Sequence, residues 1–111
     1  MKFVVSLIFA ATASLSLTAQ ANDEGTAAIE TLGKLNGIAL ACQQPALVSR
    51  ARNAVTTTAP KTRSNGEIFE NATNASYLEQ GKGHPCPELP QLVEQISQAE
   101  KRLQAAFPAA K

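Results

Sequence analysis

The sequence predicts an all-α fold, a small four-helix bundle of short helices with one disulfide, preceded by a cleavable signal peptide. Three observations support this prediction. Apolar residues recur at steps of three and four in four separate stretches, and no stretch alternates apolar and polar residues as a half-buried strand does. The 111-residue chain has only two cysteines. It also begins with the pattern of an export signal.

Residues 1–21 have the three parts of a signal peptide. Lys2 supplies a short positive region, residues 3–13 are apolar, and residues 19–21 read Ala-Gln-Ala, the small-x-small pattern of a cleavage site. The apolar part is too short to span a bilayer as a retained anchor. We therefore expect cleavage after this site, in a bacterium.

Cleavage after Ala21 leaves residues 22–111 as a single helical exported domain, which we expect in the periplasm or outside the cell. No later stretch of the sequence approaches membrane-spanning length, so we expect no membrane span after cleavage. Ten Lys and Arg face nine Asp and Glu, a formal net charge of +1 that includes Lys2. Such a balanced charge does not support a nucleic-acid partner.

The first predicted helix covers residues 26–43. Its apolar positions share one face at three- and four-residue spacing: Ile29, Leu32, Leu35, Ala39 and Cys42. Residues 22–25 are expected to form a frayed lead-in, with Asp23 or Thr26 as the N-cap.

Two glycines, Gly33 and Gly37, lie four residues apart on the first predicted helix. Glycine costs a helix interior about 1 kcal/mol relative to alanine, so a pair of them needs a reason. We predict that they allow another helix backbone to approach closely. A membrane dimer motif is the alternative, which the polar neighbours Glu30 and Lys34 disfavour.

Proline and glycine divide the rest of the chain into three further helices. Residues 45–58 form the second, with an apolar face of Leu47, Val48, Ala51, Ala54 and Val55. The third follows an S-x-x-E capping box at residues 64–67 and ends at Gly81. Its expected buried stripe is Ile68, Phe69, Ala72, Ala75 and Leu78.

The fourth predicted helix covers residues 89–107 and has the most regular apolar spacing. Pro90 suits its first turn and Pro108 ends it. The buried stripe is Leu92, Ile96, Ala99, Leu103 and Ala106.

Cys42 and Cys86 are predicted to form a disulfide, because two cysteines in an exported chain most often pair. The bond would fix the end of the first helix to the segment before the last one. Closing a loop of this size removes unfolded-state entropy worth about 4 kcal/mol in the chain-entropy model.

The middle of the chain is basic. No acid occurs between Glu30 and Glu67, whereas that interval holds five cations: Lys34, Arg50, Arg52, Lys61 and Arg63. One interpretation is a solvated helix face. The other makes Arg50, Arg52, Lys61 and Arg63 a docking patch for an anionic partner, such as an acidic protein surface or the phosphates of the envelope.

A metal site is the alternative use of the cysteines. His84 and Cys86 form an H-x-C pair that, together with Cys42, offers three ligands to copper or zinc. A fourth ligand is missing and the chain has no second histidine. We therefore expect neither a metal nor another cofactor.

The sequence gives no support to catalysis. It has no C-x-x-C motif for thiol exchange, no C-x-x-C-H motif for haem attachment and no G-x-S-x-G nucleophile elbow. We predict that the protein is not an enzyme.

In length, export signal and cysteine separation the chain resembles the small periplasmic helical proteins with one disulfide, which include acid-stress chaperones and immunity proteins against envelope-targeted toxins. This likeness in outline carries no residue roles. The function we predict is a non-catalytic binding protein of the bacterial envelope whose partner is another envelope or secreted protein. The alternative is a periplasmic copper- or zinc-binding protein.

Overall fold

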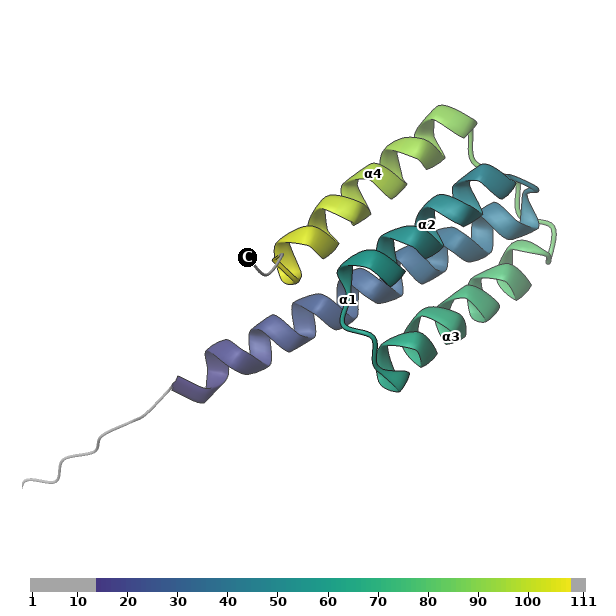
Figure 1. Cartoon of the computed structure of the whole chain (residues 1–111). Coiled ribbons are helices and arrows are strands. Elements are labelled where there is room, and N and C mark those ends of the chain that lie inside the picture. Colours follow the sequence, from purple (N-terminus) through teal and green to yellow (C-terminus); the bar gives the residue numbers. More distant parts are fainter. Residues whose placement is uncertain (1–13, 109–111) are drawn as a thin grey trace, which may run out of the picture.

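The computed structural model describes residues 14–108, with side chains from residue 23 onward. These residues form four helices and no strand, which confirms the all-α prediction (Figure 1). The helices are α1 (Ser14–Ala41), α2 (Pro45–Thr58), α3 (Arg63–Gln80) and α4 (Leu89–Ala106). None of these helices is long and apolar enough to cross a membrane. The predicted signal peptide lies mostly outside the described residues, so its cleavage stays a prediction.

Helix α1 is the centre of the molecule. The other three helices all pack against it, and α2 also packs against α4. Figure 1 shows α3 and α4 on opposite sides of the pair formed by α1 and α2. No Cα of α3 lies within 8 Å of a Cα of α2 or α4 in the described part of the chain. The bundle is therefore open on the α3 side.

The prediction for the start of α1 was wrong. The helix begins at Ser14, so residues 22–25 are helical and neither Asp23 nor Thr26 caps its N-terminus. The residues before Asn22 are mostly good helix formers, and no proline interrupts them. Gly25 is tolerated inside the helix because the ring of Phe107 lies against it, where a Cβ atom would collide.

The other end of α1 is close to the prediction, two residues earlier than expected. Gln43 has a left-handed φ of 58°, which turns the chain out of the helix. The Gln44 amide then donates to the Ala39 carbonyl at 2.9 Å, and the Gln43 amide to the Leu40 carbonyl at 3.2 Å. These two bonds satisfy carbonyls that the helix end leaves open.

Helices α2 and α4 match their predictions. Helix α2 has the expected bounds and buries Leu47 and Ala51. Helix α4 ends one residue earlier than expected, and the predicted stripe is buried at Leu92, Ile96, Ala99 and Leu103. These residues form one core with α1, in which Ile29, Leu32 and Ala39 have no exposed surface.

Helix α3 differs from its prediction at both its start and its buried face. Thr62 is the N-cap, and its side chain accepts the Asn65 amide at 3.1 Å, so the box predicted at residues 64–67 is wrong. The buried residues are Phe69, Ala72 and Thr73, whereas Ala75 and Leu78 are exposed. The face is narrow because α3 packs on one helix only.

Close packing of α1 on α3 confirms the prediction for the two glycines. A Cβ on Gly33 would lie 2.7 Å from the Phe69 carbonyl oxygen and 2.7 Å from the Ala72 Cβ. A Cβ on Gly37 would lie 2.8 Å from the Tyr77 backbone nitrogen. Because Gly33 and Gly37 carry no side chain, the backbone of α3 can approach α1 this closely.

Polar bonds fix the register of the same interface. The buried Asn36 side-chain amide donates to Thr73 Oγ1 at 3.1 Å, and that hydroxyl lies 3.1 Å from the Gly33 carbonyl. One turn further on, Ser76 Oγ donates to the Lys34 carbonyl at 2.7 Å. Because such bonds form only at one alignment, α3 cannot slide along α1 without breaking them.

Candidate functional site

The predicted disulfide is present. Cys42 and Cys86 are joined with an S–S distance of 2.06 Å and a Cα–Cα distance of 5.9 Å. The bond connects the residue after α1 to the segment before α4, as expected. That segment is shaped further by Gln80, whose amide donates to the carbonyls of His84 at 2.8 Å and Pro85 at 3.1 Å. The loop is thus held at several points.

His84 pairs with an acid at the end of α3. Its Nε2 lies 3.0 Å from Glu79 Oε2, and Lys82 Nζ lies 3.3 Å from the other oxygen of that carboxylate. The hydrogen bond with His84, and then that with Lys82, lower the pKa of Glu79 below its usual 4.5. The three groups form a small ion-pair network on the surface beside the disulfide.

The disulfide removes two of the three ligands on which the copper or zinc alternative depends. A thiolate ligand must be reduced, and the bond between Cys42 and Cys86 leaves only His84 of the proposed ligand set. Among the side chains of residues 23–108, no three His, Cys, Asp or Glu residues lie close enough together to hold a metal ion. No observation favours this alternative over the binding function.

Arg50, the first of the predicted partner-binding residues, points to α4. Its guanidinium binds both oxygens of Glu100 at 2.9 Å and Ser97 Oγ at 3.0 Å. The hydrogen bond that Arg50 donates to the Glu100 carboxylate raises the pKa of Arg50. Such a bidentate pair joins α2 to α4, and it neutralises the charge that a partner would meet.

The other three predicted residues lie towards α3. Arg52 pairs with Glu70 at 3.0 Å and stands 5.6 Å from the ring centre of Phe69. Arg63 pairs with Glu67 at 3.2 Å. Lys61 is exposed on the connection between α2 and α3.

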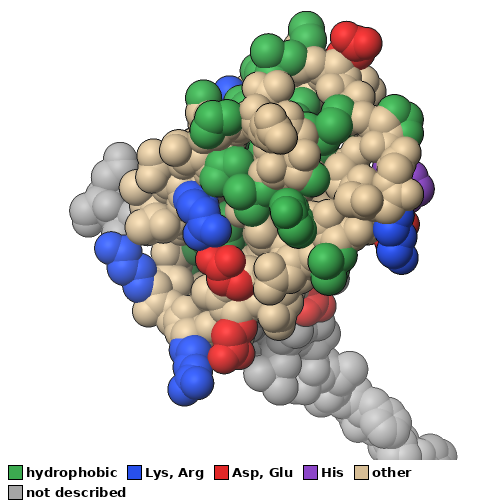
Figure 2. Space-filling view, turned by 90° about the vertical axis from the view of Figure 1, so that its right-hand side faces the viewer, with side chains coloured by type: hydrophobic (Ala, Val, Ile, Leu, Met, Phe, Trp, Pro, Cys, Tyr) green, Lys and Arg blue, Asp and Glu red, His purple; other side chains and the backbone are tan. Residues whose placement is uncertain are grey.

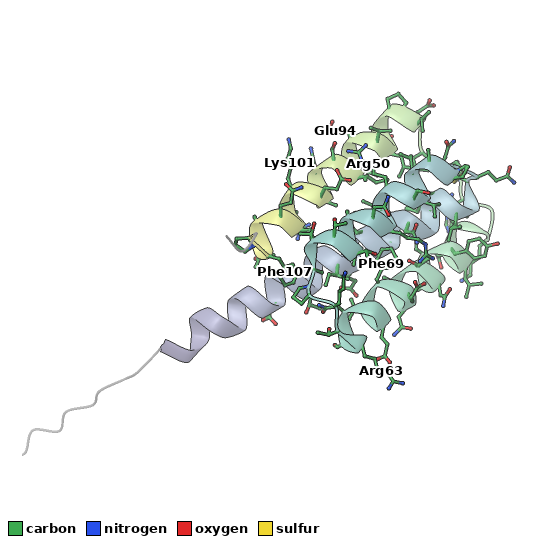
Figure 3. All side chains as sticks on the ribbon, viewed as in Figure 1. Arg50, Arg63, Phe69, Glu94, Lys101 and Phe107 are labelled. Atoms are coloured by element: carbon green, nitrogen blue, oxygen red, sulfur yellow. A yellow bond between two sulfur atoms is a disulfide. The ribbon has the colours of Figure 1, made fainter. Side chains whose placement is uncertain are left out.

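The four predicted cations therefore do not form one patch. Arg52 and Arg63 line a common groove between α2 and α3, together with the acids they pair with. Figure 3 shows Arg50 near α4 and Arg63 at the start of α3, on different sides of the molecule. Contact of these residues with a partner stays a prediction.

Large apolar side chains are exposed together at one end of the bundle, which sequence reasoning missed. Leu40 is 40% exposed, Tyr77 48%, Leu78 66% and Leu89 47%. The first lies at the end of α1, the next two in the last turn of α3 and the last at the start of α4. We call these four residues the disulfide-end surface.

Figure 2 views this end of the molecule directly. Hydrophobic side chains gather over its middle, and the charged side chains lie around its edges. Periodicity had assigned Leu78 to the core, and Leu40 falls outside the spacing of the buried face of α1. The surface becomes visible only in the fold, where no Cα of α3 comes within 8 Å of a Cα of α2 or α4 in the described residues.

Comparison with known proteins identifies no relative from which a role for this surface could be inferred. No protein-family model matches the chain, and neither the curated proteins nor the solved structures contain a match.

Proposed function

We propose that the chain is a non-catalytic binding protein of the bacterial envelope, exported by its signal peptide, which holds another envelope or secreted protein at the disulfide-end surface. The observation that carries the proposal is the exposure of Leu40, Tyr77, Leu78 and Leu89 at one end of a small domain. Scattered apolar residues on a surface are ordinary, but a group of large ones on one face is typical of an interaction site.

The chemistry of this surface suits a protein partner. It combines leucines with one tyrosine, and aromatic residues are enriched among those that carry binding energy in interfaces. The disulfide holds the end of α1 close to the segment that leads into α4. Leu40 and Leu89, which lie at these two helix ends, are therefore positioned before any partner binds. A pre-formed surface loses little conformational entropy when it binds.

Photo-cross-linking in the exporting bacterium tests the proposal. The photoreactive residue p-benzoyl-phenylalanine replaces Tyr77, and in a matched control it replaces Lys101, which points outward from α4 in Figure 3. We expect the photoreactive residue at position 77 to give one defined adduct with an envelope or secreted protein, identified by mass spectrometry. Adding Leu78→Ser and Leu89→Ser should lower its yield at least about tenfold.

Three outcomes would contradict the proposal. They are no adduct at Tyr77, the same adducts at both positions, and an adduct that contains two copies of this chain. Circular dichroism of the doubly substituted protein is the control for folding. Because both leucines are about half or more exposed, we expect it to melt close to the wild type.

A further inference from the structure

The outer side of α1 carries a line of residues that the other helices leave exposed or only partly buried. Glu30, Lys34 and Ile38 follow one another at four-residue spacing, which places them in a row along the helix. Helices α3 and α4 pack on either side of α1 without approaching each other in the described residues. The row is therefore the floor of a trough with α3 and α4 as its walls.

Two hollows make up this trough. The hollow on the α3 side has a volume of about 630 Å³, and Ala72, Ala75 and Ser76 contribute to its wall. The hollow on the α4 side measures about 380 Å³. Both are lined by Lys34 and Ile38, so they lie next to each other on α1 with these two side chains between them. Each falls in the size range of binding pockets.

The charges of the trough are uneven. The hollow on the α4 side is lined by Lys34 and Arg102 and by no carboxylate. Neither cation takes part in a salt bridge among the described side chains. The hollow on the α3 side is lined by Lys34 and by two carboxylates, Glu30 and Glu79, of which Glu79 already binds His84 and Lys82. The α4 side of the trough thus presents two cations that form no salt bridge with the side chains of residues 23–108.

We propose that this trough receives an amphipathic helix of the partner protein that carries acidic residues along one flank. The proposal rests on the binding function above and names the chemistry of the partner. The small side chains of Ala72 and Ala75 allow apolar residues of the guest helix to approach α3 and Ile38 closely. Its acidic flank then faces Lys34 and Arg102.

A helix fits this trough better than an extended peptide does. An extended segment gains main-chain hydrogen bonds by joining a sheet edge, and the described residues contain no strand that could offer one. A helix satisfies its own backbone and needs only side-chain contacts. The trough also runs along α1 from Glu30 to Ile38, so a guest helix can lie beside it for about two turns.

Two designed peptides test the proposal. Both are fluorescein-labelled amphipathic helices of roughly 18 residues, or five turns, with the same leucine and alanine face. One carries glutamate on its flank and the other lysine. Fluorescence anisotropy measures their binding to the oxidised chain that starts at Asn22. We expect the glutamate peptide to bind at least about tenfold more tightly, a difference of 1.4 kcal/mol.

Charge reversal gives the decisive comparison. Lys34→Glu with Arg102→Glu should exchange the preference, so that the lysine peptide binds and the glutamate peptide does not. The matched control is Lys101→Glu with Asn53→Glu and Gln104→Glu, which changes the net charge equally at exposed sites outside the trough. We expect this control to leave the preference unchanged. All the substituted residues are exposed, so the variants should fold.

Equal binding of the two peptides, binding of neither, or equal effects of the charge reversal and its control would overturn the proposal. Vesicles of phosphatidylglycerol form a separate arm. If they bind through Lys34 and Arg102 while both peptides fail, the anionic surface recognised is a membrane and the helix proposal is wrong. Cross-linking at Tyr77 tests the binding function independently, so failure of the trough is distinguishable from failure of that function.

Discussion

Gly37 is one of the two glycines that allow the close packing of α1 on α3. A Cβ at this position would lie 2.8 Å from the Ser76 Cβ and 2.8 Å from the Tyr77 backbone nitrogen. The second of these is backbone and can move only if α3 moves. We predict that Gly37→Ala lowers the free energy of unfolding by about 1–3 kcal/mol, the usual cost of overpacking. Urea unfolding of the oxidised chain from Asn22 measures it.

Gly66 is the control for this substitution. It lies in the first turn of α3, and a Cβ there would have no atom within 4 Å. Gly66→Ala should therefore stabilise the protein by about 0.5–1 kcal/mol through helix propensity alone. A loss of stability in both variants, or a gain in both, would show that close packing at Gly37 is not the cause.

The contacts of Glu79, in the last turn of α3, should make the free energy of unfolding depend on pH in the acid range. The pKa of Glu79 is lowered in the folded protein by its hydrogen bonds with His84 and Lys82. Its ionised form therefore stabilises the fold above the unfolded pKa of about 4.5, and this stabilisation is lost as the pH falls through the lower folded value.

Comparison with Glu79→Gln isolates this effect. We predict that between about pH 5 and pH 3 the melting temperature of the wild type falls further than that of Glu79→Gln. Thermal unfolding followed by circular dichroism in matched ionic strength measures both. Because the group is exposed, salt should weaken the difference. Parallel pH profiles for the two proteins would be evidence against the network.

The helices show which features local sequence signals could predict. Pro45 and Pro90 lie in the first turns of α2 and α4, so proline geometry located both helices and periodicity identified their buried faces. The start of α1 was missed because residues before Asn22 were assigned to a signal peptide, although their propensity continues the helix.

Helix α3 shows what periodicity alone cannot supply. The apolar spacing correctly predicted that residues 68–78 are helical. Burial of Ala75 and Leu78 would require a second helix packed against this part of α3, and none lies there in the described residues. For the same reason the sequence predicted the disulfide but neither the disulfide-end surface nor the trough. Both arise where α3 and α4 fail to meet, which is a property of the whole fold.

At the scale of the whole molecule, the disulfide encloses two complete helices. Cys42 and Cys86 are 44 positions apart, and α2 and α3 both lie between them. Helix α3 packs closely on α1, and α2 packs on both α1 and α4, so the loop holds one face of α1 and part of the shared core. The bond also fixes the segment that leads into α4. Its removal should therefore weaken the fold as a unit.

We predict that Cys42→Ser with Cys86→Ser lowers the free energy of unfolding by about 4 kcal/mol, the entropy that a loop of this length removes from the unfolded chain. For a domain whose total stability is about 5–15 kcal/mol, this loss leaves a marginal fold. Urea unfolding of both proteins with and without reductant measures the effect. Reductant should shift the wild type to the midpoint of the double variant and leave the variant unchanged, because only the wild type has a bond to break. If full reduction left the urea midpoint of the wild type unchanged, the prediction would be wrong, and packing on α1 would hold the four helices together without the disulfide.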